Sequence, residues 1–355
     1  MTQAAPYVEL HLHTAYSFLD GASRADELIT RAKELGYQAL AVTDHDGLHG
    51  ALEFARLARD AGIRPITGAE ITLIDGSHLT LLVETRQGYQ NLCKLITAAY
   101  RTVRTNTPEW LPEDDTTPWA EHQDGDTPGH YRDAEQAPWL DPLLLPRYAE
   151  GLILLTGCRR GRLAQLVDAD RLPEARAQIR QYLEWFGQEN VFVELQHNYV
   201  FGDTQRIDRL VKLARETGVG YVATENVHYP RRDRDRLHDV LVAIRHRTTL
   251  DGSHRQRRPN AHFALTAPEE MAHRFQRYPE AIAATVAIAD RCASFDLNHD
   301  LGYTFPDYPV EPGETPDDAL ARICTEPFAL RYPPGHPRRG QAEERLAEEL
   351  RLIRH

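Results

Sequence analysis

Short apolar segments that lead into metal-binding side chains recur along the chain. The segments and their side chains are residues 39–43 with Asp44 and His45, residues 64–69 with Glu70, residues 151–157 with Cys158, and residues 221–224 with Asn226 and His228. Stretches of helical periodicity separate several of them. Strands that alternate with helices form a parallel sheet, and a closed barrel of such units collects its active residues at the carboxyl ends of the strands. The pattern therefore predicts an α/β barrel with a polar site at one rim.

Two histidines near the start of the chain add to this pattern. His11 and His13 stand two residues apart in the apolar segment 8–14. Side chains two residues apart in a strand point to the same face, so the imidazoles converge on one point, as a metal site requires. A half-exposed strand surface is the alternative interpretation of such a pair. His78 opens the apolar segment 79–83 instead of ending one, so we do not expect every candidate ligand at the same rim.

Four helices are predicted from apolar periodicity and from residues that begin or end a helix. Ser23 is a candidate N-cap with Asp26 three residues later, and Gly36 follows as a stop signal. The other three helices extend over residues 51–61, 280–292 and 342–353. Residues 305–314 are rich in proline and are expected to form an extended connector.

Composition limits the classes of protein to which the chain can belong. Its 355 residues are enough for one large barrel or two ordinary domains. No apolar run reaches the roughly 18 residues of a membrane span, and no basic region followed by a hydrophobic one stands at the N-terminus. The four cysteines lie far apart and form no CxxC pair, which argues against a disulfide framework. We therefore expect a cytoplasmic protein without a membrane partner.

Charge is distributed unevenly along the chain, whose formal net charge is −12. Residues 104–142 are acidic and rich in proline and threonine, which predicts a solvated insertion between barrel elements. Residues 231–258 carry many arginines directly after His228. A basic surface beside a metal site would guide a phosphate backbone toward it. The alternative is that these arginines pair with aspartates of the same segment or contact another part of a larger protein.

Ordered motifs give the chain a resemblance to one family. They are His11-Leu12-His13, Ser17-Phe18-Leu19-Asp20-Gly21, Thr43-Asp44-His45, Gly68-Ala69-Glu70, His78-Leu79-Thr80-Leu81-Leu82 and Thr156-Gly157-Cys158. Together they resemble the PHP (polymerase and histidinol phosphatase) domain. Residues 88–92, 237–244 and 268–271 are similar to the bacterial C-family DNA polymerases, the alpha subunits of DNA polymerase III. Residues 244–250 and 258–261 are similar to the error-prone branch of that family.

The resemblance implies a PHP-type (βα)7 barrel with two to three divalent metal ions, and zinc, manganese and iron suit such ligands. The implied sites are His11, His13, Glu70 and Asn226 for one ion, Glu70, His78 and Cys158 for a second, and Asp20, His45 and His228 for a third. The candidates for catalytic roles are Glu70, His13 and Asp20. The candidates for substrate binding, chosen by sequence proximity, are Arg159, Arg160, Arg231 and Arg232. The histidines expected to be surface or structural are His197, His238, His246, His254 and His262.

One position departs from the family pattern, in which aspartate usually stands where this chain has Asn226. An amide oxygen can bind a metal ion but carries no charge, so the first ion should bind more weakly and its bound water should be less acidic. Glu225 is adjacent, but neighbouring side chains of a strand point to opposite faces, which makes it a poor substitute. The departure bears on catalytic competence more than on fold.

Three functions are compatible with the sequence. The first is a metal-dependent phosphoesterase, a 3′-5′ exonuclease on DNA, as the PHP domain of a polymerase in replication or repair. The second is a non-catalytic scaffold, held together by metal ions, that supports a polymerase body or a proofreading partner. The third is a small-molecule phosphatase of the histidinol-phosphate type, which the polymerase-like motifs disfavour. The sequence contains neither a GxSxG motif nor a Walker-type phosphate loop.

The expected domain organisation is a barrel domain at residues 1–290, followed by a connector and the start of a polymerase palm at residues 291–355. No paired aspartates of the palm type follow the barrel, so the chain by itself should not synthesise DNA.

Overall fold

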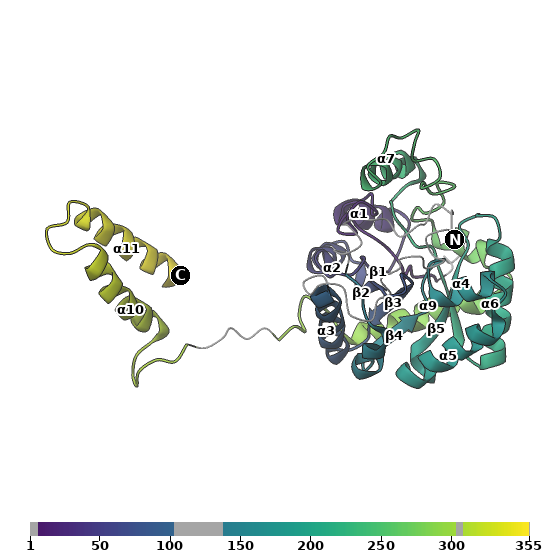
Figure 1. Cartoon of the computed structure of the whole chain (residues 1–355), viewed down its shortest axis with the longest axis horizontal. Coiled ribbons are helices and arrows are strands. Elements are labelled where there is room, and N and C mark those ends of the chain that lie inside the picture. Colours follow the sequence, from purple (N-terminus) through teal and green to yellow (C-terminus); the bar gives the residue numbers. More distant parts are fainter. Residues whose placement is uncertain (1–5, 103–137, 303–307, 355) are drawn as a thin grey trace, which may run out of the picture. The chain divides into compact units, whose positions relative to one another are not determined.

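The computed structural model describes residues 6–102, 138–302 and 308–354. The chain divides into two compact units, Met1–Leu301 and Gly302–His355 (Figure 1). Most of the predicted insertion at residues 104–142 lies outside the described residues. None of the described helices is long and apolar enough to cross a membrane.

Six strands form one sheet, and their order in the sheet is their order in the chain. They are β1 (Ala39–Val42), β2 (Arg64–Thr72), β3 (His78–Val83), β4 (Leu152–Leu155), β5 (Val191–Gln196) and β6 (Gly220–Thr224). Neighbouring strands are parallel, except that β3 runs antiparallel to both β2 and β4. The expectation of a parallel sheet was therefore wrong for β3. A parallel crossover takes about a dozen residues, whereas only residues 73–77 link β2 to β3.

Residues 8–13, called the closing segment below, connect the two edges of this sheet. Glu9 forms a parallel bridge with Leu40 of β1, and Leu12 forms one with Val227, which follows β6. Backbone hydrogen bonds accompany both bridges. The closing segment thus completes the curled sheet as a barrel and confirms the predicted βα barrel class. The seventh member of the barrel is a segment with two isolated bridges instead of a regular strand.

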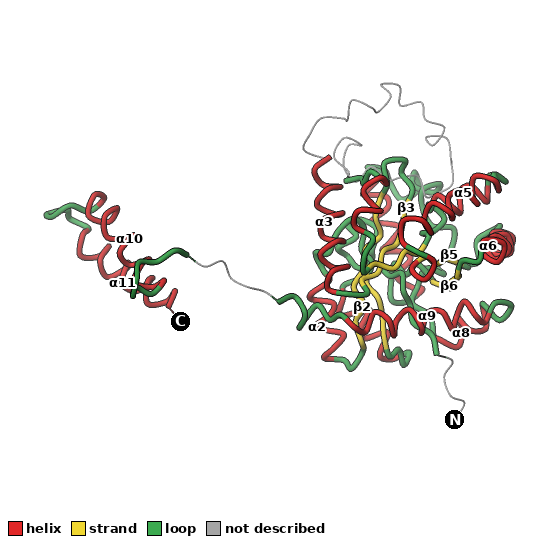
Figure 2. The backbone as a smooth tube through the Cα atoms, turned by 90° about the horizontal axis from the view of Figure 1, so that it is seen from below, coloured by secondary structure: helices red, strands yellow, loops and turns green. Residues whose placement is uncertain are grey.

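Helices surround the strands (Figure 2). They are α1 (Ala25–Glu34), α2 (Ala51–Asp60), α3 (Arg86–Thr102), α4 (Arg162–Asp168), α5 (Leu172–Phe186), α6 (Asp203–Thr217), α7 (Asp235–Arg245), α8 (Pro268–Arg274) and α9 (Pro279–Arg291). The predicted cap of α1 was displaced by one residue. Arg24, not Ser23, occupies the N-cap position, and its backbone N–H donates to the Glu27 carboxylate at 3.1 Å. Gly36 follows α1 with a φ of 79°.

The inside of the barrel is apolar at one end and polar at the other. Ile288 and Ala289 of α9 pack against inward side chains of the strands. These are Val8, Leu10, Ala39, Ala41, Ile66, Leu82, Ile153, Leu155 and Val222. Because alternate residues of a strand face the same side, the inward positions of β3 change along the strand from His78 and Thr80 to Leu82. The opposite end therefore carries the polar side chains that form the site.

Two helices make up most of the second unit. They are α10 (Pro316–Arg331) and α11 (Arg339–Arg354). Thr315 caps α10, because its hydroxyl oxygen accepts the Asp318 backbone N–H at 3.2 Å. Helix α11 confirms the helix predicted over residues 342–353, whereas α10 was not predicted. The predicted connector at residues 305–314 lies partly outside the described residues.

Candidate metal centre

The candidate ligands come from segments far apart in the sequence and meet at one rim of the barrel. Glu70 lies near the end of β2, and His45 follows β1. His78 opens β3, but because β3 runs antiparallel to β2, its start lies at the rim where β2 ends. His11 and His13 of the closing segment join them there. The reversed strand thus delivers a ligand that a parallel strand would have placed at the opposite end.

The Glu70 carboxylate lies at the centre of the group and is shared by four imidazoles. Its Oε1 lies 3.5 Å from His11 Nε2 and 3.2 Å from His78 Nδ1. Its Oε2 lies 3.5 Å from His13 Nε2 and 3.0 Å from His45 Nδ1. Burial opposes ionisation of Glu70, but the surrounding imidazoles, His78 first, outweigh burial and hold the pKa of the carboxyl well below its usual value. Glu70 is therefore an anion at neutral pH.

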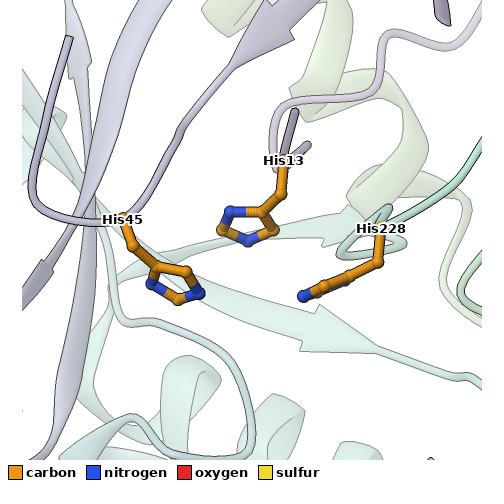
Figure 3. Close-up of side chains that lie close together, drawn as sticks. All are labelled: His13, His45 and His228. Carbon is orange, nitrogen blue, oxygen red and sulfur yellow. The ribbon is translucent and has the colours of Figure 1, made fainter. Parts of the chain in front are cut away.

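Three overlapping clusters of potential ligand atoms form around this carboxylate. They are His11 with His13 and Glu70, His45 with Glu70 and His78, and His13 with His45 and His228. Within each cluster the ligand atoms lie within 4.8 Å of one another. Figure 3 shows His13, His45 and His228 pointing toward one another from three separate segments. The structure thus brings together most of the ligands that the resemblance implied.

Hydrogen bonds at Nδ1 orient two of these imidazoles so that Nε2 faces the centre. His11 Nδ1 lies 2.6 Å from Glu194 Oε1, and His13 Nδ1 lies 3.1 Å from Ser17 Oγ. Ser17 in turn donates its hydroxyl proton to Asp44 Oδ1 at 2.6 Å, so the Ser17 oxygen accepts from His13. A neutral imidazole that donates from Nδ1 presents the lone pair of Nε2, which is the form that binds a metal ion.

His228 is oriented in the same way by Asn226. Its Nδ1 donates to the Asn226 backbone carbonyl at 2.8 Å, which leaves Nε2 as an acceptor. Burial, together with the Arg258 guanidinium, lowers the pKa of His228 to about 3, so this imidazole is neutral at neutral pH. Asn226 has a φ of 54°, a left-handed conformation that asparagine tolerates better than most residues. Its side-chain Oδ1 lies 3.1 Å from His13 Nε2, within reach of the first implied site.

Asp20 presents its two oxygens to different neighbours. Oδ2 lies 2.9 Å from His45 Nε2 and 3.4 Å from His228 Nε2. Oδ1 faces three basic side chains, which are His238 at 3.5 Å, Arg245 at 3.4 Å and Arg258 at 3.5 Å. Burial opposes ionisation of Asp20, but the basic side chains that face its two oxygens hold the pKa of the carboxyl well below its usual value. Asp20 thus links the imidazoles to a basic group of side chains.

Cys158 is buried in the loop that follows β4, but it belongs to none of the three clusters that the described residues form. The loop is fixed against the start of β3. Gly157 has a φ of 86°, and a Cβ at this position would lie 2.2 Å from the His78 carbonyl oxygen. The His78 backbone N–H also donates to the Arg160 carbonyl at 3.3 Å. Of the three ligands implied for the second site, Glu70 and His78 therefore belong to a cluster and Cys158 does not.

The candidate substrate-binding arginines differ in their surroundings. Arg159 and Arg160 are partly buried in the loop after Cys158. Arg231 and Arg232 lie at the surface and form ion pairs, which join Arg231 to Glu34 at 2.7 Å and Arg232 to Glu270 at 2.6 Å. The alternative of pairing within the arginine-rich segment applies to Arg257, which lies 2.9 Å from Asp239.

Two parts of the site were missed in the sequence. Strand β5 was not predicted, and with it Glu194, whose buried Oε1 accepts hydrogen bonds from Gln196 Nε2 at 2.7 Å and Thr224 Oγ1 at 2.5 Å. A glutamate in the middle of an otherwise apolar run is the signal that would have found it. His238 was expected at the surface or in a structural role, but it is buried and faces Asp20.

The arrangement of these groups fits divalent metal ions. Glu70 Oε1 and His78 Nδ1 are buried and lie 3.2 Å apart, and neither makes a hydrogen bond among the described residues. An unpaired buried polar atom costs about 1–3 kcal/mol, and a shared cation would satisfy both atoms. Imidazoles with a bridging carboxylate suit zinc, manganese or iron. Glu225 lies outside this group, as predicted, because its carboxylate accepts from Arg274 Nη1 at 2.8 Å.

Comparison with known proteins agrees with this geometry. The model of the PHP domain family matches residues 9–198, so the chain belongs to the PHP domain family. An error-prone DNA polymerase of Symbiobacterium thermophilum is 38% identical over 346 residues, which cover 97% of this chain and 30% of the relative. The DNA polymerase III subunit alpha of Thermus aquaticus is 33% identical over 352 residues, covering 92% and 26%. The chain thus spans less than a third of the length of these relatives, and the resemblance read from its motifs is confirmed.

Among solved structures, an amidohydrolase from Chromobacterium violaceum resembles the chain with a TM-score of 0.43 and 17% identity, over 64% of this chain and 89% of that protein.

Proposed function

We propose that the chain is a metal-dependent phosphoesterase that acts on DNA as a 3′-5′ exonuclease, within a C-family polymerase. The observation that carries this proposal is the Glu70 carboxylate, whose two oxygens lie within 3.5 Å of four imidazole nitrogens. A carboxylate placed in this way can hold two cations close together. Metal ions at such a separation neutralise a phosphoryl group and activate water for hydrolysis. The polymerase relatives support DNA as the substrate, and the cytoplasm remains the proposed location.

The protein's own residues hold this chemistry in place. Glu70, His13 and His45 belong to two clusters each, and Asp20 extends the group toward the basic side chains. Glu194 and Ser17 fix the imidazole rings, so little rotation is needed before a metal ion binds. Arg159, Arg160, Arg231 and Arg232 remain proposals for phosphate binding, as do Cys158 as a ligand and the number of ions. The domain boundary at residue 290 also remains a proposal.

The test is hydrolysis of a 5′-labelled single strand by protein purified without chelator, with the metal content measured on the same sample. We expect the strand to shorten from its 3′ end, and EDTA to stop the reaction. Glu70→Gln should abolish both hydrolysis and most metal binding, because it removes the shared charge. Glu184→Gln, on the exposed side of α5, is the matched control. Full hydrolysis by Glu70→Gln would exclude this site as the source of the activity.

A second candidate function is a metal-bound scaffold without catalysis, and Asn226 favours it. The amide oxygen 3.1 Å from His13 Nε2 supplies no negative charge to the first cluster. Asn226→Asp separates the two functions, because a carboxylate there strengthens binding at that cluster. A large gain in hydrolysis would identify a weakened enzyme, whereas tighter metal binding without hydrolysis would identify a scaffold. Hydrolysis of histidinol phosphate in preference to DNA would instead favour the small-molecule phosphatase.

A further inference from the structure

Arg258 lies directly against two of the candidate ligands. Its Nη2 is 2.5 Å from His228 Nε2 and 3.5 Å from Asp20 Oδ1. The side chain is mostly buried, with 10% of its surface exposed. It comes from the loop after α7, outside the segments that carry the candidate ligands. An arginine that donates to a ligand atom is therefore part of the site itself.

The contact uses the one lone pair that His228 can offer. Its Nδ1 donates to the Asn226 carbonyl, so Nε2 is the only acceptor of the ring. The same lone pair would bind a metal ion, at a distance of about 2.0–2.1 Å for zinc. One lone pair cannot serve a guanidinium N–H at 2.5 Å and a metal ion at the same time. Arg258 and a cation at this position therefore exclude each other.

The charges around Asp20 also disfavour a metal ion at this position. Arg258 and Arg245 both face Asp20 Oδ1, while the other oxygen of Asp20 faces His45 and His228. Two guanidinium groups beside one carboxylate leave little negative charge to attract a further cation. A metal ion between Asp20 and His228 would be repelled by a positive charge only a few ångströms away.

Two other contacts hold the Arg258 side chain beside this position. Its guanidinium carbon lies 4.3 Å from the centre of the Phe263 ring, and its Nε donates to His238 Nε2 at 3.3 Å. Neither contact depends on His228 or Asp20. The arginine can keep these partners while it releases the ligand atoms through rotation of the guanidinium end.

We infer that Arg258 competes with a metal ion for the position between His228 and Asp20, and so sets the metal affinity there. This inference rests on the proposed metal centre but not on hydrolysis. Arg258 weakens this position, so that it fills at a higher metal concentration than it would without the arginine. Neutral replacements of Arg258 should tighten it.

The experiment is a titration of the full chain with Mn²⁺ alone, in which free Mn²⁺ is followed by electron paramagnetic resonance. Arg258→Gln and Arg258→Met remove the charge, and methionine keeps an unbranched stem against Phe263. We expect one binding step to tighten at least about tenfold in both variants, or about 1.4 kcal/mol. Arg257→Gln, one residue away and paired with Asp239, should leave every step unchanged.

Thermal unfolding in EDTA separates competition from a merely structural role. Without metal ions, Asp20 loses one of its basic partners in the Arg258 variants, so the unfolding temperature should fall. A variant that is less stable without metal but binds metal more tightly supports competition, whereas one that loses both stability and affinity overturns it. Unchanged Mn²⁺ binding in folded Arg258→Gln or Arg258→Met also overturns it. Failure of the wild-type chain to bind Mn²⁺ would refute the metal centre itself, which is a different result.

Discussion

Glu194 provides the sharpest test of how the centre is held. Its Oε1 lies 2.6 Å from His11 Nδ1, and both side chains are fully buried. Glu194→Gln keeps the shape but removes the charge that fixes the ring. A hydrogen bond to a charged group contributes about 1.5–3 kcal/mol, and loss of a carboxylate behind a ligating histidine typically costs 10–100-fold in metal affinity, or about 1.4–2.8 kcal/mol. The two estimates agree, so we expect Glu194→Gln to lower the metal affinity of the cluster of His11, His13 and Glu70 by about 10–100-fold.

The pKa of His11 has an opposing effect, so we expect the loss of metal affinity to lie toward the lower end of this range. Burial lowers the pKa of His11, but Glu194 and Glu70 outweigh burial and raise it well above its usual value. A metal ion must displace that proton, and loss of Glu194 makes the displacement easier. The assay is competition for Zn²⁺ between the protein and a chromophoric chelator at neutral pH. Glu189→Gln, exposed before β5, is the control. Affinity within threefold of wild type in a folded Glu194→Gln protein would refute the reasoning.

Two further predictions concern stability. Burial, and then the neighbouring Glu225, raise the pKa of Glu9 to about 8 from 4.5. Between about pH 4.5 and 8 the native state therefore keeps a proton that the unfolded chain has released, so the free energy of unfolding falls as the pH rises through this range. Glu9→Gln should flatten this part of the dependence of stability on pH, measured by urea unfolding. Gly157→Ala should cost more than the roughly 1–3 kcal/mol of a left-handed non-glycine residue, because its Cβ would meet the His78 carbonyl, whereas Gly62→Ala has the same strain but nothing within 4 Å. Equal losses in the two alanine variants would show that the close contact is unimportant.

Most of the centre could be predicted because its ligands follow apolar runs directly. A strand buried on both faces is apolar throughout, so the first polar residue after it marks the rim. Asp44, His45 and Glu70 were found in this way. Strand β5 was missed for the opposite reason. Its inward positions include Glu194 and Gln196, which serve the site, so polar residues interrupt the apolar run.

Sequence patterns did not predict the direction of β3 or the group of side chains around Asp20. Alternation of strands and helices predicts parallel pairing, whereas the short link at residues 73–77 is compatible only with an antiparallel pair. His238 and Arg258 come from the segment after the barrel strands, where spacing gives no register relative to the rim. Only the folded chain shows that both face Asp20.

The closing segment also governs when the centre can exist. It bridges Leu40 near the start of the sheet and Val227 just beyond its last strand, and it carries His11 and His13. The ligands therefore assemble only after a loop of more than two hundred residues has closed, a slow step for a growing chain. A metal ion held there binds the closed barrel and not the open one, so it stabilises the closed state by mass action. Retention of a bound metal ion therefore indicates that the barrel has closed.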